Sequence, residues 1–307
     1  MAFAPDGRTA FIYDGAGNFL WWDTEHGKLR HRSTCGRDWG PTCAVFSLSG
    51  RYLLTGCPGG LRLWEVITAK RAQTIPMLWG TPVALAFCPD GRHALSADER
   101  GRLFLWDLGQ GKLCRVLEGS GAYRNSSAVA ISSDGKWAAG ILDHGTTLTL
   151  WDLSSGEEFR TLTSQATPGE SFTKVAFSPD GKQLLACAYP GQLSLWEAAS
   201  GRLLAQFTSP VGVAVSCLAF WSGGRGVLVG TAPGSAVSPG LPLGSLSEWE
   251  LPKGRLCRIW DRQRGAAKVV LTHTGTQALV LGGMIVSGYG TCVMAGWSIN
   301  CQELLIV

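Results

Sequence analysis

The chain has 307 residues, of which 45% are hydrophobic and 16% are charged, and its formal net charge is +4 at pH 7. This composition is too apolar for an intrinsically disordered protein and rich enough in hydrophobic residues to build a core. Because the charge is small and the basic residues are scattered, no basic stripe of the kind that follows a phosphate backbone is present, and nucleic-acid binding is not indicated. The 41 glycines and 13 tryptophans favour an all-β fold with many tight turns.

A turn element recurs along the chain. It is FAPDGR at residues 3–8, FSLSGR at 46–51, FCPDGR at 87–92, ISSDGK at 131–136, FSPDGK at 177–182 and FWSGGR at 220–225. Each element follows an apolar stretch, and its glycine supplies the positive φ that a tight hairpin turn requires. The closing glycines are 41 to 46 residues apart. A fixed period of this size predicts a repeat architecture.

A second element keeps the same period and phase. It comprises WWD ending at Asp23, RLWE at Glu65, FLWD at Asp107, TLWD at Asp152, SLWE at Glu197 and RIWD at Asp261. The stretches that end in these tryptophans alternate in the manner of half-buried strands. A further short strand is expected after a Gly-Lys or Gly-Arg turn. Four strands per unit, repeated radially, form the blades of a β-propeller.

These paired elements resemble the WD40 repeat family over nearly the whole chain. The resemblance implies an all-β, WD40-type β-propeller of about seven four-stranded blades that form a single domain over residues 1–307. The expected blades cover residues 1–32, 43–75, 83–118, 127–164, 173–208, 216–272 and 276–307.

The last two blades depart from the pattern. In the sixth, Trp260 is expected to end the third strand, and residues 232–254 to form an inserted surface loop because they are dense in Pro, Gly and Ser. A partner-docking arm that uses Trp249 and Leu251 is the alternative for this insertion. The seventh blade is degenerate, and MIVSGY from Met284, TCVMAGW ending at Trp297 and a final ELLIV are expected to be its last three strands.

The family's stabilising network is incomplete in this chain. The resemblance implies a Gly-His pair before each first strand and an Asp six residues before each repeat Trp. The pair is missing, and the Asp is replaced by Ala16, Pro58, Arg100, Gly145, Pro190 and Gly254. Since the usual hydrogen-bonded network cannot form, Trp and Leu packing is expected to hold the blades. Met1 falls inside the first strand, so the chain is expected to be either a complete protein with an open closure or a piece of a longer one.

No catalytic signature is present in the sequence. It contains no nucleophile elbow, P-loop, HExxH or dinucleotide fingerprint, and its five histidines are dispersed. The aspartates of the turns and of the Trp-Asp pairs are expected to be structural. We therefore predict that the protein is not an enzyme and that it takes no cofactor, metal or small-molecule substrate.

Two further features bear on location. The ten cysteines include no CxxC pair and no secretory signal precedes them, so they are expected to be mostly buried, in a cytoplasmic or nuclear protein that is not secreted. Residues 278–299 are uncharged and long enough to cross a membrane, but they contain five glycines. A degenerate blade is favoured there over a transmembrane helix.

Binding residues are expected in the loops at the top face, because loops on a rigid scaffold usually carry function. The resemblance implies binding positions one residue before the lost Asp and five and seven residues before the Phe of each turn. They correspond to Glu99, His144, Tyr189, Pro41, Ser126 and Phe172, joined by Trp39, Arg124 and Glu170. Exposed aromatic and arginine side chains carry most interface energy. The preferred candidates are therefore Trp39, Arg124, Phe172 and Tyr189.

The predicted function is a non-catalytic scaffold that presents top-face loops to partner proteins or peptides. The alternative is the regulatory or sensor WD40 portion of a larger multidomain protein that is linked to an NTPase or kinase domain. An enzyme with a central metal is the third hypothesis, and the dispersed histidines disfavour it.

Overall fold

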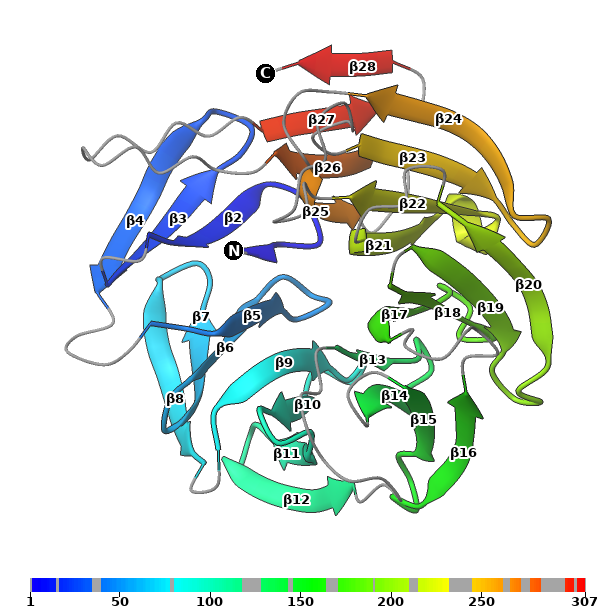
Figure 1. Cartoon of the computed structure of the whole chain (residues 1–307). Coiled ribbons are helices and arrows are strands. Elements are labelled where there is room, and N and C mark those ends of the chain that lie inside the picture. The colour runs from blue at the N-terminus through cyan, green and yellow to red at the C-terminus, as the bar shows by residue number, and fades with distance from the viewer. Residues whose placement is uncertain are drawn as a thin grey trace. The chain divides into compact units, whose positions relative to one another are not determined.

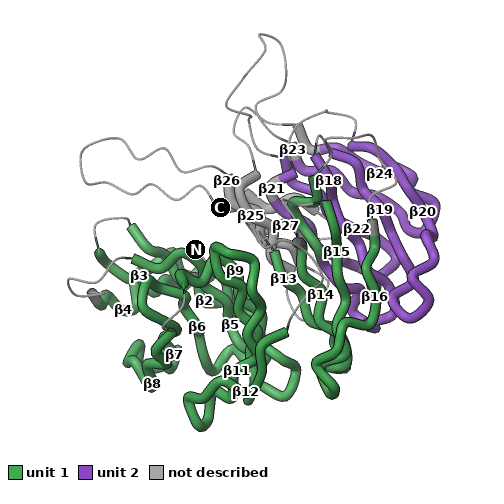
Figure 2. The backbone as a smooth tube through the Cα atoms, turned by 60° about the horizontal axis from the view of Figure 1, so that its bottom comes forward, with its two compact units in different colours: residues 1–175 green, residues 176–307 purple. Residues whose placement is uncertain are grey.

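The computed structural model describes residues 2–14, 17–34, 40–77, 80–117, 128–142, 146–163, 171–189, 191–209, 215–231, 245–261, 266–271, 277–282, 296–300 and 303–306. The chain divides into two compact units, residues 1–175 and 176–307 (Figure 2). Within the described residues, all regular structure is β except for one 3-10 turn at Ser222–Gly224.

The described strands form seven four-stranded antiparallel sheets (Figure 1). In the first unit, the first sheet contains β1 (Ala2–Phe3), β2 (Thr9–Tyr13), β3 (Asn18–Asp23) and β4 (Lys28–Thr34), and the second contains β5 (Cys43–Phe46), β6 (Tyr52–Cys57), β7 (Gly60–Glu65) and β8 (Lys70–Pro76). The third sheet contains β9 (Pro82–Phe87), β10 (His93–Asp98), β11 (Leu103–Asp107) and β12 (Lys112–Leu117). The fourth contains β13 (Val129–Ile131), β14 (Trp137–Leu142), β15 (Thr147–Asp152) and β16 (Glu158–Thr163).

The fifth sheet contains β17 (Phe172–Phe177), within which the unit boundary falls, and β18 (Gln183–Ala188), β19 (Gln192–Glu197) and β20 (Leu203–Thr208). The second unit continues with β21 (Val215–Trp221), β22 (Gly226–Thr231), β23 (Ser245–Glu250) and β24 (Arg255–Asp261), and then with β25 (Ala266–Leu271), β26 (Gln277–Gly282), β27 (Gly296–Asn300) and β28 (Glu303–Ile306). The predicted all-β fold of four-stranded blades, as in a WD40-type β-propeller, is confirmed.

The turn glycines have the backbone conformation that the sequence requires. Their φ values are +70° at Gly7, +69° at Gly50, +66° at Gly91, +71° at Gly135 and +70° at Gly181. A residue with a Cβ rarely adopts these angles, so glycine sets each turn between the first and second strands of a blade.

Hydrophobic clusters pack successive blades together within each unit. In the first unit β1 lies beside β5, β5 beside β9, and β9 beside β13. Phe19 and Trp64, from the first and second sheets, meet edge to face with ring centroids 5.1 Å apart. In the second unit, Leu185 and Leu195 of the fifth sheet cluster with Trp249 of the sixth. The predicted packing of large apolar side chains therefore holds neighbouring blades together.

Part of the hydrogen-bonded network survives without the missing His and Asp. The Trp64 indole Nε1 donates to Thr55 Oγ1 at 3.0 Å, and Trp106 Nε1 donates to Ser96 Oγ at 2.8 Å; both hydroxyl residues are fully buried. In the first sheet, Ile12 occupies the position that Thr55 occupies in the second sheet. Isoleucine offers no hydrogen-bond acceptor, and Trp22 Nε1 is buried without a hydrogen-bond partner among the described residues. Hydrogen bonding therefore supports packing in the second and third blades.

A recurring backbone hydrogen bond fixes the blade register. In the first six blades, the amide that follows the acidic residue at the end of the third strand donates to the carbonyl of the basic residue that ends the turn element. This bond joins Leu108 N to Arg92 O at 2.9 Å and Leu251 N to Arg225 O at 2.7 Å. Glu250 therefore occupies in the sixth blade the position that Asp107 occupies in the third.

This register corrects the expected sixth blade. The third strand is β23, which lies inside the stretch 232–254 that was expected to be an inserted loop, and the repeat tryptophan is Trp249 rather than Trp260. Trp260 lies in β24, the fourth strand. The RIWD motif lies on the fourth strand, of which residues 255–259 are largely exposed, whereas Trp249 on the third strand is 5% exposed in the core.

The last sheet is corrected in the same way. β25 begins at Ala266, inside the stretch that was assigned to the sixth blade, and β26 is the second strand. The expected second strand from Met284 lies outside the described residues, and Trp297 is in β27, the third strand. The hydrophobic pattern indicated strands here but not their order, because the markers that set the register elsewhere are absent.

Candidate protein-binding surface

Three connections of the first unit lie close together at one end of their strands. Pro41 precedes β5, Thr81 precedes β9 and Glu99 follows β10. The Thr42 hydroxyl donates to the Pro82 carbonyl, and to the Gly56 carbonyl at 3.1 Å. We call Pro41, Thr42, Thr81, Glu99 and Arg100 the loop surface.

Glu99 is attached to this surface by its backbone and its side chain. Its amide donates to the Thr81 carbonyl at 3.0 Å, and its carboxylate accepts a hydrogen bond from the Thr81 amide. Both Glu99 and Arg100 are exposed, and Pro41 is half-buried. Two of the predicted binding residues, Pro41 and Glu99, are therefore connected through the Thr42–Pro82 and Thr81–Glu99 contacts.

A buried carboxylate braces the turn that carries Glu99. Asp98 is fully buried, and its Oδ1 accepts the amides of Arg100 at 3.0 Å and Arg102 at 2.8 Å. Its Oδ2 accepts Nε of Arg102 at 2.9 Å and Nη2 at 2.7 Å. A charge-assisted contact in which two guanidinium N–H groups donate to one carboxylate oxygen fixes geometry as well as adding stability. Asp98 lies eight residues before Trp106, whereas the family position that the sequence pattern indicates lies six residues before it, so the pattern does not reveal Asp98.

In the second unit, Tyr189 follows β18 and is 56% exposed. The turn that carries it is closed by a 2.7 Å hydrogen bond from the Gly191 amide to the Ala188 carbonyl. An exposed tyrosine on a short, closed turn presents a large contact area at a small entropic cost.

Phe172 is the predicted binding residue that the structure removes from the surface. It begins β17 and is 2% exposed, so its ring packs in the interior instead of meeting a partner. Its spacing from Phe177 indicated a position in the fold, but spacing alone does not reveal burial. The other predicted residues, Trp39, Arg124, Ser126, His144 and Glu170, lie outside the described residues.

The recurrent carboxylates of the repeat hold turns at the opposite end of the strands. Asp23 Oδ1 accepts the amides of Glu25 and His26, both at 3.0 Å, and its Oδ2 accepts Arg30 Nη2 at 2.6 Å. Asp107 accepts Arg92 Nη2 at 2.9 Å. The hydrogen bond from Arg30, followed by that from the His26 amide, holds the pKa of the Asp23 carboxyl well below its usual range. These residues have structural partners, as expected of the repeat.

Acid is expected to destabilise the protein partly through Asp23. A carboxylate whose pKa is lower in the folded state stabilises the fold above its unfolded pKa, near 3.8, and loses that contribution as the pH falls towards its folded pKa. We expect the free energy of unfolding, measured with urea between pH 6 and pH 2, to fall more steeply below pH 4 in the natural protein than in Asp23→Asn. Arg30→Gln should also flatten the profile, and parallel profiles for all three proteins would contradict this assignment.

The described residues contain no group of three or more His, Cys, Asp or Glu side chains that would hold a metal ion. Over the same part of the chain, no helix has the length and apolar character needed to cross a membrane. Of the described cysteines, Cys57, Cys88, Cys187 and Cys217 are buried, while Cys114 and Cys257 are exposed. Burial raises the pKa of the Cys88 thiol to about 12.

Comparison with known families identifies the repeats. The sequence model described as "WD domain, G-beta repeat" matches residues 78–107 and 156–197. Both matched segments end on the acidic residue that follows a repeat tryptophan, Asp107 or Glu197. The chain contains WD40 repeats. The matched segments cover most of the third blade and parts of the fourth and fifth.

Curated relatives align with these WD40 repeats at low identity. Telomerase protein component 1 of Mus musculus is 26% identical over 244 residues, which are 79% of this chain and 9% of that protein. Autophagy-related protein 16 of Arabidopsis thaliana is 25% identical over 69% of this chain and 42% of its own length. The target of rapamycin complex subunit wat1 of Schizosaccharomyces pombe is 22% identical over 57% of this chain and 54% of its own length. The chain therefore spans less than half of the length of the first two relatives.

Proposed function

We propose that this WD40 protein is a non-catalytic interaction scaffold that presents its blade-connecting loops to partner proteins. The observation that carries the proposal is the loop surface, where exposed Glu99 and Arg100 stand on a turn braced by buried Asp98. A binding surface needs side chains that are accessible and held in place, because ordering mobile side chains on binding costs affinity. WD40 repeats in relatives that are named as a complex subunit and as an autophagy-related protein favour the same class of function.

The composition of the loop surface suits a polar, reversible interface. On the loop surface, Glu99 and Arg100 supply one acidic and one basic group side by side, and Pro41 supplies a rigid apolar contact. Tyr189, in the second unit, is a separate exposed aromatic side chain. Charges at the rim of an interface mainly set specificity and association rate, whereas aromatic residues supply most of the affinity. A partner with both a charged and an apolar patch would match the loop surface.

A second candidate function is the regulatory or sensor portion of a larger protein. The low share of the mouse and Arabidopsis relatives that aligns with this chain favours it, because there the matched segment is one part of a much longer protein. An NTPase or kinase domain in the adjoining coding sequence would support this function. A stop codon directly upstream of Met1 would count against it.

The scaffold proposal is tested by affinity purification from cells that express the full chain. The test variant is Glu99→Ala/Arg100→Ala on the loop surface. A second variant adds Trp39→Ala, Arg124→Ala and Tyr189→Ala, and it omits Phe172 because that side chain is buried. We expect the recovery of specific partners, quantified by mass spectrometry, to fall at least tenfold, because loss of interface anchors commonly costs about 2 kcal/mol or more.

The matched control is Leu48→Ala/Ile67→Ala. Leu48 is 54% exposed and Ile67 is 79% exposed, and both lie in turns at the opposite end of the second sheet. The control should recover partners as the natural protein does. Unchanged recovery by the test variant, or an equal loss in the control, would remove the loop surface as the binding site.

A further inference from the structure

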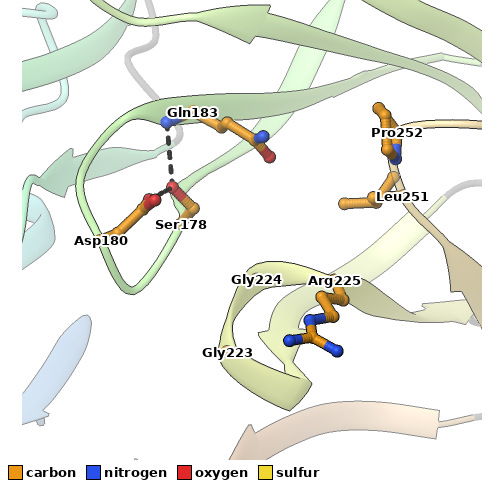
Figure 3. Close-up of a pocket in the computed structure, with 8 residues that line it drawn as sticks. All are labelled: Ser178, Asp180, Gln183, Gly223, Gly224, Arg225, Leu251 and Pro252. Carbon is orange, nitrogen blue, oxygen red and sulfur yellow. Dashed lines mark hydrogen bonds between the residues drawn. The ribbon is translucent and has the colours of Figure 1, made fainter.

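A small pocket lies in the second unit, between turns of the fifth and sixth sheets (Figure 3). Its volume is about 200 Å³, and its lining includes Ser178, Asp180, Gln183, Arg225, Leu251 and Pro252. In the close-up, the turn that carries Ser178 and Asp180 faces the turn that carries Arg225, and Leu251 and Pro252 form a third wall. These turns are at the opposite end of the strands from the turn that carries Tyr189.

Arg225 lines this pocket with a guanidinium group that has no ion-pair partner among the described residues. Its counterpart in the third blade, Arg92, donates to the Asp107 carboxylate from Nε at 3.2 Å and from Nη2 at 2.9 Å. The two arginines occupy equivalent positions, because the backbone carbonyl of each accepts a hydrogen bond from the amide that follows the acidic residue of the repeat.

The pairing differs because a second arginine takes the acidic residue of the sixth blade. Glu250 stands where Asp107 stands in the third blade, but its Oε2 accepts Arg255 Nε at 2.8 Å and Nη2 at 2.5 Å. Arg255 begins β24, directly opposite Glu250 in the register of the sheet. The contact leaves the Arg225 guanidinium exposed at the pocket.

The remaining walls supply an unfilled acceptor and an apolar face. Gln183 Oε1 is buried and accepts no hydrogen bond within the described part of the chain. Leu251 is 7% exposed and, with Pro252, forms the apolar wall. Asp180 is engaged on one side, since its Oδ1 accepts the Ser178 hydroxyl at 2.5 Å and the Lys182 amide at 3.0 Å.

We propose that this pocket binds the carboxylate side chain of an extended peptide segment from a partner protein. A guanidinium group binds a carboxylate through two parallel hydrogen bonds, and a peptide N–H is the donor that Gln183 lacks. The aliphatic stem of a glutamate would lie against Leu251 and Pro252. The volume is below the range of pockets for drug-sized ligands, so a single side chain is the better fit.

A singly charged carboxylate suits the pocket better than a phosphate group. Asp180 carries a negative charge on the facing wall, and although burial opposes it, the hydrogen bond from Ser178 keeps the pKa of the Asp180 carboxyl below its usual value. A doubly charged group would meet more repulsion from Asp180 than a carboxylate would. The pocket is distinct from the loop surface, and its occupation does not depend on that surface binding a partner.

The proposal is tested by NMR titration of the full chain with capped tripeptides. The probe is N-acetyl-Ala-Glu-Ala-amide, and the matched probe N-acetyl-Ala-Gln-Ala-amide lacks the charge. We expect the Glu peptide to shift the Arg225 side-chain Nε–H resonance in a saturable way, with an affinity at least fivefold higher than that of the Gln peptide. Arg225→Gln should weaken binding of the Glu peptide at least fivefold.

Arg92→Gln is the matched control, because that side chain is already paired with Asp107. It should leave binding of the Glu peptide unchanged, and so should Glu99→Ala/Tyr189→Ala on the other surfaces. Equal binding of the two peptides, or full binding by Arg225→Gln, would overturn the proposal. Tighter binding of a phosphoserine tripeptide than of the Glu peptide would overturn the carboxylate assignment.

Discussion

Replacing Asp98 with alanine is expected to lower the free energy of unfolding by about 3 kcal/mol, because it removes a buried carboxylate and leaves two backbone amides and the partly buried Arg102 guanidinium without their acceptor. Asp98 is fully buried, and its two oxygens accept hydrogen bonds from two backbone amides and the Arg102 guanidinium. Alanine would leave these donors without their acceptor in a low-dielectric setting. The change is measured as a shift in the midpoint of urea unfolding.

Asp14→Ala is the matched control in the first blade. Asp14 also lies eight residues before a repeat tryptophan, and it accepts the Asn18 amide at 3.0 Å and the Asn18 side-chain amide at 2.6 Å, but its site is only partly buried. We expect a loss of about 1 kcal/mol there, as for an ordinary hydrogen bond. If Asp14→Ala destabilises the protein as much as Asp98→Ala, burial of the ion pair is not the cause.

Thr55→Val is expected to lower the free energy of unfolding by about 2 kcal/mol, because it leaves a buried indole N–H without an acceptor. Valine has nearly the volume of threonine, so packing around Trp64 changes little. The hydroxyl of Thr55 is the partner of Trp64 Nε1 at 3.0 Å, and both side chains are buried. Urea unfolding of the full chain measures the loss.

The Trp64→Phe background provides the control for this prediction. Phenylalanine has no N–H to leave unpaired, so Thr55→Val should cost much less there than in the natural protein. Ser96→Ala in the third blade should repeat the loss, since Trp106 donates to Ser96 at 2.8 Å. An equal cost of Thr55→Val in both backgrounds would show that the hydrogen bond does not contribute.

Together these two predictions separate the stability of the blades from the binding surface. Asp98 belongs to both, because it holds the turn on which Glu99 is presented, whereas Thr55 holds the interior of the second blade. If the loop surface binds partners as proposed, Asp98→Ala should reduce partner recovery and Thr55→Val should not, when the two variants are compared at equal fractions of folded protein.

The sequence by itself determined the repeat. A period of 41 to 46 residues, glycines at the turns and apolar stretches ending in Trp are local features, and each follows from backbone sterics or from strand alternation. For this reason the predicted blades agree with the first five sheets, whereas the sixth repeat was assigned the wrong third strand although it carries both markers. The structural roles of Asp23 and Asp107 followed as well, because residues at fixed turn positions find their partners nearby in the chain.

Only the tertiary structure decided the features that depend on contacts between distant residues. The third strand of the sixth blade is β23, because β23 is the strand that pairs with β22. The Trp-Asp motif at Trp260 lies in β24 and does not indicate this pairing. Phe172 is buried by neighbouring elements, although its spacing matched an exposed family position. Arg225 has no ion pair like that of Arg92, because Glu250, the acidic residue of its blade, is paired with Arg255, 30 residues further along the chain than Arg225. Burial and pairing are properties of packed strands, and a local motif does not encode them.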